Sequence, residues 1–189
     1  MIHTLKQSLC PVRFMTGVMV LFFFFLIGSC ASKLPMPEKL FPGYTGPQIA
    51  VTPKAIRLGI AGLVKTQVVI AGSGFQPGDS VFVDMVSTEG NQNINIPIDA
   101  AKIDPNGQFT VEVSKEVKAL EILKLDIDPS DLTPIVVRDP IPIGKYIVTA
   151  VSVDSDRKAE CPINVEAPSW GDKLKDKIGV WFGKIRIGR

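Results

Sequence analysis

Short segments in which apolar and polar residues alternate recur from residue 48 to residue 167, and they constrain the fold more than any other feature. Isoleucine stands at every second position of 94–98, and phenylalanine and valine do the same in 109–113. Successive side chains of a β-strand point to opposite faces, so each segment is predicted to be a strand with one buried face. Further strands are predicted at 49–51, 55–58, 64–71, 80–86, 146–150 and 159–165. Seven or more short strands over about 120 residues predict an all-β fold, an antiparallel β-sandwich.

One segment departs from this alternation. Val117, Leu120 and Leu123 recur at helical spacing after Ser114, and serine is a residue type that caps helix N-termini. The pattern predicts a short helical insertion in the sandwich. An irregular loop with four prolines, 126–143, is predicted to follow, and connections of this length are often functional.

The first 29 residues have the organisation of a secretory signal. Two basic residues and no acid lie in 1–13, an apolar stretch covers 14–27, and two small residues, Gly28 and Ser29, follow. A helix that spans a bilayer needs about 20 apolar residues, so this stretch is too short to be one. Residues 1–29 are therefore predicted to be a signal peptide and no part of the fold.

The end of this signal has a more specific pattern. Ile27, Gly28, Ser29 and Cys30 resemble the bacterial lipobox, in which an aliphatic residue and two small ones precede a cysteine. The resemblance implies that the Cys30 thiol receives a diacylglyceryl group and that cleavage occurs just before it. It further implies a lipoprotein of the bacterial cell envelope, held to a membrane by its lipid, and Ala31 favours the outer membrane where there is one. A plain secretory signal with a coincidental cysteine is the alternative.

Residues 30–47 are predicted to connect this cysteine to the sandwich as a tether. The segment contains four prolines and two glycines, which prevent regular structure and favour an extended, semi-stiff chain. Such a spacer would hold the domain predicted for 48–167 clear of the lipid headgroups.

Residues 72–81 read Gly-Ser-Gly-Phe-Gln-Pro-Gly-Asp-Ser-Val and resemble a motif of bacterial immunoglobulin-like domains, IPT/TIG-type surface modules among them. Segments 104–113 and 144–150 resemble the middle and penultimate strands of the same family. The resemblance implies an immunoglobulin-like sandwich with an architectural role in display, adhesion, spacing or partner docking.

The residue types of this glycine-rich run also indicate a structural corner. Gly72, Gly74 and Gly78 supply backbone freedom between two strands, and Phe75 can plug the end of the sandwich. A phosphate-binding loop is the alternative. It is disfavoured because a strand, and no helix, is predicted to follow the run.

The side chains that most often perform catalysis or bind transition metals are scarce after residue 29. The only histidine, His3, lies in the signal, so the commonest general base and metal ligand is lost with it. Cys161 is the only cysteine after Cys30, and it is predicted to be a buried, inert thiol on the core face of its strand. The sequence therefore predicts a protein that is not an enzyme and has no cofactor.

Charge is balanced once the signal is removed. Lys6 and Arg13 are two of the 21 basic residues and none of the 19 acidic residues lies there, so 19 of each remain. Residues 169–189 hold six basic and two acidic residues. A near-neutral body with one basic tail argues against nucleic-acid binding.

Asp126, Asp128 and Asp131 form a weak candidate for a metal site, and Asp154 with Asp156 forms a second acidic cluster. Calcium prefers several carboxylate oxygens, but the spacing is not that of an EF-hand and aspartate is common in turns. Structural turns are therefore favoured over metal binding. Tyr146, which follows Gly144, is predicted to donate a hydrogen bond to a loop backbone, as in a tyrosine corner.

Residues 168–189 are predicted to form a basic amphipathic helix, with its lysines mostly off one apolar stripe. Three glycines lower its intrinsic helicity, so the stripe is expected to be covered by a surface, with Trp181 buried. Three surfaces are possible: its own sandwich, a membrane or a partner protein. The stripe comprises Trp170, Leu174, Ile178, Trp181, Phe182 and Ile185.

These features together predict a cell-envelope lipoprotein whose sandwich is a non-catalytic binding or scaffolding module with an envelope protein as its partner. A ligand- or carbohydrate-binding module that uses the 126–143 loop is the alternative. Sugars commonly stack on aromatic rings, and no aromatic residue lies between Phe109 and Tyr146, which counts against this alternative.

Overall fold

A computed structural model of the chain describes residues 44–88 and 94–188. The predicted signal, Cys30 and most of the predicted tether lie outside these residues. The chain divides into two compact units, residues 1–35 and 36–189, and everything below concerns the second.

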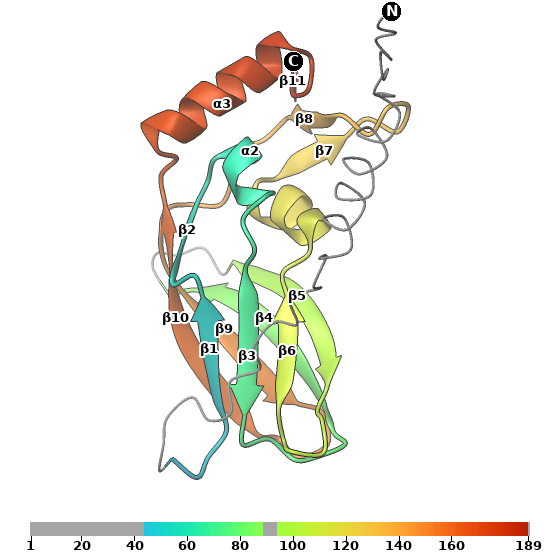
Figure 1. Cartoon of the computed structure of the whole chain (residues 1–189), viewed down its shortest axis with the longest axis vertical. Coiled ribbons are helices and arrows are strands. Elements are labelled where there is room, and N and C mark those ends of the chain that lie inside the picture. The colour runs from blue at the N-terminus through green and yellow to red at the C-terminus, as the bar shows by residue number, and fades with distance from the viewer. Residues whose placement is uncertain (1–43, 89–93, 189) are drawn as a thin grey trace, which may run out of the picture. The chain divides into compact units, whose positions relative to one another are not determined.

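Two β-sheets face each other in this unit (Figure 1). The larger sheet has the strand order β2-β10-β9-β4-β5, and the smaller sheet has the order β1-β3-β6. The prediction of a mostly β fold with a sandwich is confirmed. The strand pairs of these two sheets are antiparallel, as predicted, except that β2 pairs with β10 in parallel. The strands are β1 (Gln48–Thr52), β2 (Ala55–Arg57), β3 (Val69–Ser73), β4 (Ser80–Ser87), β5 (Asn95–Lys102), β6 (Phe109–Glu112), β9 (Gly144–Ser152) and β10 (Lys158–Glu166).

The core lies between the two sheets and is built from the alternating positions of the strands. In β4, Val81, Val83 and Met85 are buried, whereas Phe82 on the other face is 56% exposed. β9 and β10 alternate in the same way and pair in antiparallel register across their whole length. Each fully buried valine or isoleucine side chain contributes about 1.5–3 kcal/mol of hydrophobic stabilisation, so this alternation decides the fold.

The segment predicted as a strand at 64–71 is corrected by the structure. A short helix, α2 (Ile60–Leu63), precedes it, and the chain then turns before β3 begins at Val69. Thr66 closes the turn, since both its N–H and its hydroxyl donate hydrogen bonds to the Gly62 carbonyl. A short apolar run does not distinguish strand from helix, which is why the pattern failed at this position.

The helical insertion forms as predicted, although its helix is a π-helix, η1 (Val117–Ile122). The Ser114 hydroxyl accepts a hydrogen bond from the Val117 N–H at 3.1 Å, so the predicted capping residue satisfies the first turn. The prediction that 126–143 is irregular is wrong, because β7 (Leu125–Ile127) and β8 (Pro134–Val136) pair there in antiparallel register. β11 (Arg186–Ile187) joins β8 in parallel and completes a third sheet.

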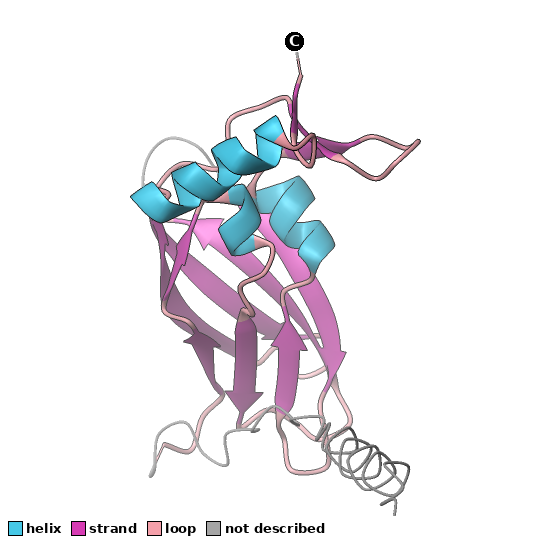
Figure 2. Cartoon of the chain, turned by 45° about the horizontal axis from the view of Figure 1, so that its top comes forward, coloured by secondary structure: helices cyan, strands magenta, loops and turns pink. Residues whose placement is uncertain are grey.

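The C-terminal helix is shorter than predicted. α3 (Trp170–Trp181) begins at the cap residue Ser169 and ends where Gly183, at φ +70°, turns the chain back. A left-handed glycine is a common helix stop. Figure 2 shows α2, η1 and α3 together at one end of the sandwich, and we call this the helical end. Residues 182–187 thus belong to a turn and a strand, and they lie beyond the end of α3.

Candidate functional site

The glycine-rich run 72–79 forms a corner at the end of the sandwich away from the helices, which we call the closed end (Figure 1). Gly74 and Gly78 adopt φ +81° and +84°, a region that residues with a Cβ atom rarely enter. β4 follows the corner, so the predicted structural role is confirmed. Helix-dipole binding of a phosphate has no helix to use here.

Asp79 fastens this corner to the β9–β10 connection, a role that the sequence did not reveal. Its buried carboxylate accepts hydrogen bonds from the backbone N–H groups of Ser80, Asp154 and Ser155 and from the Ser155 hydroxyl. Burial acts to raise the pKa of the Asp79 carboxyl, but these four hydrogen bonds outweigh it and hold the pKa below its usual value. The carboxylate is therefore saturated by its own chain.

Two aromatic rings fill the closed end. Phe75 is buried, as predicted for a plug, and packs edge-on against buried Phe109 with ring centroids 5.3 Å apart. Gly72 leaves room for the second ring, since a Cβ atom there would lie 2.1 Å from the Phe109 side chain. Every distinctive residue of the corner is thus occupied in holding the fold together.

The weak metal candidates lie on the β7–β8 hairpin and pair with arginines. The Arg186 guanidinium donates to the carboxylates of Asp128 and Asp131, and Arg138 lies 3.7 Å from Asp126. Within residues 44–88 and 94–188, no three histidine, cysteine or acidic side chains gather into a metal-binding group. Asp128 and Asp131 therefore tie the hairpin to the C-terminal strand, whereas Asp126 pairs with an arginine that closely follows the hairpin itself.

Hydrogen bonds and a neighbouring positive charge hold the pKa of Asp128 below its usual value. The Ser130 hydroxyl is the largest cause, followed by the Ser130 backbone N–H, and the positive charge of Arg186 adds to both. The carboxylate stays charged at neutral pH and retains its arginine partner.

A second buried charge was not predicted. Lys118 of η1 is 2% exposed, and its Nζ donates a hydrogen bond to the Thr66 carbonyl at 2.8 Å. Burial lowers the pKa of the Lys118 amine. The predicted helical spacing did not mark the core side of η1, because Leu120 is 40% exposed and the buried residues of the helix are Lys118 and Ile122. The residue links η1 to the turn after α2.

Two further predicted residues lie on core-facing positions. The Tyr146 hydroxyl donates to the Pro142 carbonyl at 2.9 Å, so the predicted hydrogen bond to a loop backbone is confirmed. Burial raises the pKa of Tyr146. Cys161 carries a free thiol and alternates with buried Ala159 and Ile163, but it is only half-buried, which corrects the expectation of full burial.

α3 is attached to the rest of the unit through its polar side. Asp176 accepts hydrogen bonds from the backbone N–H groups of Ile60 and Ala61, at 3.0 and 2.8 Å, and so caps the N-terminus of α2. Asp172 packs where Gly59 leaves room, since a Cβ atom on that glycine would lie 2.5 Å from the Asp172 Cβ. Both acidic residues of α3 therefore face the body of the protein.

The predicted apolar stripe separates into two parts. Ile185 lies beyond the helix, is 5% exposed, and packs against Gly179. Trp170 and Trp181 are 80% and 81% exposed. Of the three surfaces expected to bury Trp181, the unit's own sandwich therefore does not do so. We call the exposed apolar residues the tryptophan face, which comprises Trp170, Leu174, Ile178, Trp181 and Phe182.

An open groove of about 480 Å³ borders the tryptophan face, between α2, α3 and β8. Apolar side chains of all three elements line it, together with three exposed lysines, Lys65, Lys175 and Lys184. Its lining contains no acidic residue. The groove and the tryptophan face form one continuous apolar and basic surface at the helical end, because Ile178 and Phe182 belong to both.

In the part of the chain that the structure describes, no helix combines the length and the apolar character that crossing a membrane requires.

Comparisons with known proteins place the chain in no family. No protein-family model matches the sequence, and a search of curated proteins found no significant match. Among solved structures, macromomycin aligns over 64% of this chain and all of its own, with 18% identity and a TM-score of 0.37. An immunoglobulin-like domain from the M. primoryensis ice-binding adhesin aligns over 64% of this chain and 96% of its own, with 12% identity and a TM-score of 0.31.

A longer structure aligns in the same manner. It is a tetra-tandem repeat from the extending region of a large adhesion protein, with 15% identity and a TM-score of 0.33. The alignment covers 63% of this chain and 23% of that structure, so this chain spans about a quarter of its length. At such scores the likeness indicates neither a shared family nor a shared function.

Proposed function

We propose that this protein is a cell-envelope lipoprotein that presents a non-catalytic binding or scaffolding module at a membrane surface. The anchor is a lipid on Cys30, and the module is the sandwich with its helical end. One observation carries the binding role: α3 is fixed to the body by its two aspartates and turns its tryptophan face outward. A monomeric domain rarely keeps large apolar side chains exposed together unless they contact something else.

The anchoring role rests on the sequence. The basic segment, the apolar stretch 14–27 and the small residues before Cys30 resemble a lipoprotein signal. A lipid at this position, followed by a proline-rich tether, would display the domain without embedding it. The outer membrane is the favoured destination in a bacterium that has one, because Ala31 follows the cysteine.

We further assign the sandwich to the immunoglobulin-like class. Two facing sheets and the hydrogen bond from Tyr146 to the Pro142 carbonyl support this assignment, since a tyrosine corner is a feature of that architecture. The fold alone does not identify a binding surface, which has to be argued from the residues, and here those of the closed end are occupied by their own contacts. The helical end is therefore the binding end.

Processing of the cysteines tests the anchor. Cys30→Ser is expected to accumulate as an unprocessed precursor and to lack a diacylglyceryl group by mass spectrometry. Cys161→Ser is the matched control, since its thiol lies half-buried on β10, and it should be processed and lipidated like the wild type. Normal cleavage and lipidation of Cys30→Ser would refute the lipoprotein assignment.

A further inference from the structure

We propose that the tryptophan face and the adjoining groove dock on the surface of an anionic phospholipid bilayer. This inference goes beyond the proposed function, and it does not depend on acylation of Cys30. It rests on the binding role assigned above to the helical end, and it names the surface which that end contacts.

The orientation of α3 is the first argument. A surface helix of a folded domain ordinarily turns its apolar face inward and its polar face to water. α3 does the reverse, because Asp172 and Asp176 face α2 whereas Trp170 and Trp181 are about four-fifths exposed. A helix held in this way leaves its apolar face free for another surface.

Charge identifies that surface. Every exposed residue of α3 is either apolar or a lysine, because its two acids and two glycines are the only residues with partial burial. The acids are thus turned away from the side that meets a partner, and the positive charges remain on it. Lysines beside tryptophan and other apolar side chains are the composition of helices that lie in the interface of an anionic bilayer. The exposed lysines of α3 are Lys173, Lys175 and Lys177.

The groove gives an independent second observation. Its lining repeats the same chemistry on separate elements, with Lys65 from the segment after α2 and Lys184 from the turn after α3, around apolar walls. A groove with apolar walls, three lysines and no acid suits a phospholipid, whose acyl chain is apolar and whose headgroup is negative. A polar or acidic protein surface would match only the lysines.

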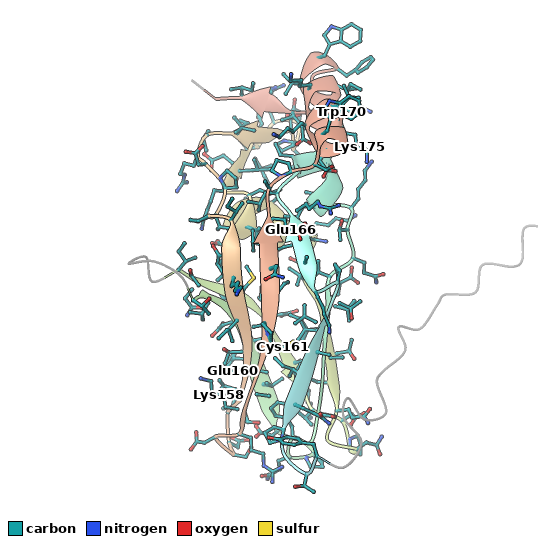
Figure 3. All side chains as sticks on the ribbon, turned by 90° about the vertical axis from the view of Figure 1, so that its left-hand side faces the viewer. Lys158, Glu160, Cys161, Glu166, Trp170 and Lys175 are labelled. Carbon is teal, nitrogen blue, oxygen red and sulfur yellow. The ribbon has the colours of Figure 1, made fainter. Side chains whose placement is uncertain are left out.

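The helical end is free to reach a membrane. In Figure 3, Trp170 and Lys175 lie at one end of the unit, and Lys158 and Glu160 lie at the other. The described chain begins at that other end, where Gly46 lies against Gly74 (Figure 1).

Intrinsic fluorescence reports this contact directly, since both tryptophans of the chain lie on the tryptophan face. The full-length protein is reconstituted into vesicles of phosphatidylcholine alone or mixed with phosphatidylglycerol, with and without brominated acyl chains. Acrylamide measures access from water, and the brominated lipid measures contact with the bilayer. The anionic vesicles are expected to give a blue shift, quenching by the brominated lipid and protection from acrylamide, all weakened by salt.

The lysines give the matched variants. Lys173→Gln and Lys177→Gln are each expected to lower the ratio of docked to undocked protein about fivefold. This factor corresponds to the ~1 kcal/mol that each basic residue contributes at an anionic surface. Lys102→Gln is the control, because Lys102 is exposed at the closed end, where it pairs with Ser80 of β4. Trp170→Phe and Trp181→Phe each leave a single tryptophan, so the fluorescence of the two variants shows separately whether each end of α3 contacts the bilayer.

Three results would overturn the proposal. Tryptophans that acrylamide quenches as strongly with anionic vesicles as without vesicles would show an undocked helix. Protection from acrylamide without quenching by brominated lipid would show that a protein, or a second copy of this chain, covers the face. Equal quenching by the two lipid compositions would show that negative charge has no part in docking.

Discussion

The two ends of this sandwich use similar residues to opposite effect. At the closed end, the aromatic rings and an aspartate are occupied by the protein's own contacts: Phe75 packs on Phe109, and Asp79 accepts four hydrogen bonds. At the helical end, glycines and aspartates again make the close contacts, but the aromatic residues Trp181 and Phe182 remain 81% and 65% exposed. The aspartates hold both ends in place, and the aromatic rings distinguish them.

This difference shows how a chain can separate stability from binding. At the closed end each aromatic ring stabilises the fold and leaves no surface to offer. At the helical end polar contacts fix the helix, so its apolar residues are not needed for folding. Mutations should therefore change stability at the first end and at the contact side of α3, and leave it almost unchanged on the tryptophan face.

The largest effect is expected at the aromatic pair of the closed end. Phe109→Ala should lower the free energy of unfolding by about 3–5 kcal/mol, because it removes a buried ring and leaves a cavity. Urea denaturation measures the change. Phe82→Ala is the control, since that ring is 56% exposed, and its effect should stay below about 0.5 kcal/mol. Equal losses in the two variants would contradict the burial on which the comparison rests.

A smaller effect is expected where the C-terminal segment returns to α3. Ile185→Ala should cost about 2 kcal/mol, because the side chain is buried against Gly179 at the edge of the unit. Ile187→Ala, two residues on in β11 and 68% exposed, should change stability by less than about 0.5 kcal/mol. Thermal melting followed by circular dichroism compares the pair. If Ile185→Ala melts like the wild type, the segment is not docked as described.

The attachment of α3 to α2 is expected to contribute less. Asp176→Ala should cost about 1 kcal/mol, the usual effect of removing a side chain that caps a helix N-terminus. Amide hydrogen exchange of Ile60 and Ala61 should accelerate, because both N–H groups lose their acceptor. Asp139→Ala, an exposed aspartate of the β8–β9 connection, is the control. Unchanged exchange at both amides would remove the basis for the outward orientation of the tryptophan face.

The smallest effect concerns pH and the first turn of α3. Two hydrogen bonds from Ser169 hold the pKa of Asp172 below its usual value. The bond from the hydroxyl has the larger effect, and the bond from the backbone N–H has the next largest. A carboxyl with a lowered folded-state pKa stabilises the fold above its unfolded pKa of about 4 and loses that contribution as pH falls through the folded-state pKa.

NMR chemical shifts of residues 170–173 should therefore lose helical character below about pH 4 in the wild type. Asp172→Asn should show no such transition in this turn, because its side chain does not titrate. A first turn that keeps its helical shifts after the side-chain carboxyl of Asp172 has itself been protonated, as followed by its own NMR signal, would show that the Ser169–Asp172 contact does not hold it.

Much of the sandwich could be predicted from local sequence. The alternation in 80–86, 109–113 and 159–165 places those strands and their buried faces correctly, since period two reflects the geometry of a strand itself. The glycine corner and the cap at Ser114 were also predictable, because each depends on residues within a few positions. The parallel pairing of β2 with β10 was not, since it joins residues more than 100 positions apart.

The candidate surface shows the same division. The sequence by itself determined that Trp170, Leu174 and Trp181 lie on one face of a helix, because helical periodicity is local. It could not determine which way that face points. Only the tertiary structure decided this, because the free N–H groups of α2 bind Asp176 and the returning chain places Ile185 on Gly179. Both contacts join distant segments, and they fix the helix by the side opposite its tryptophans.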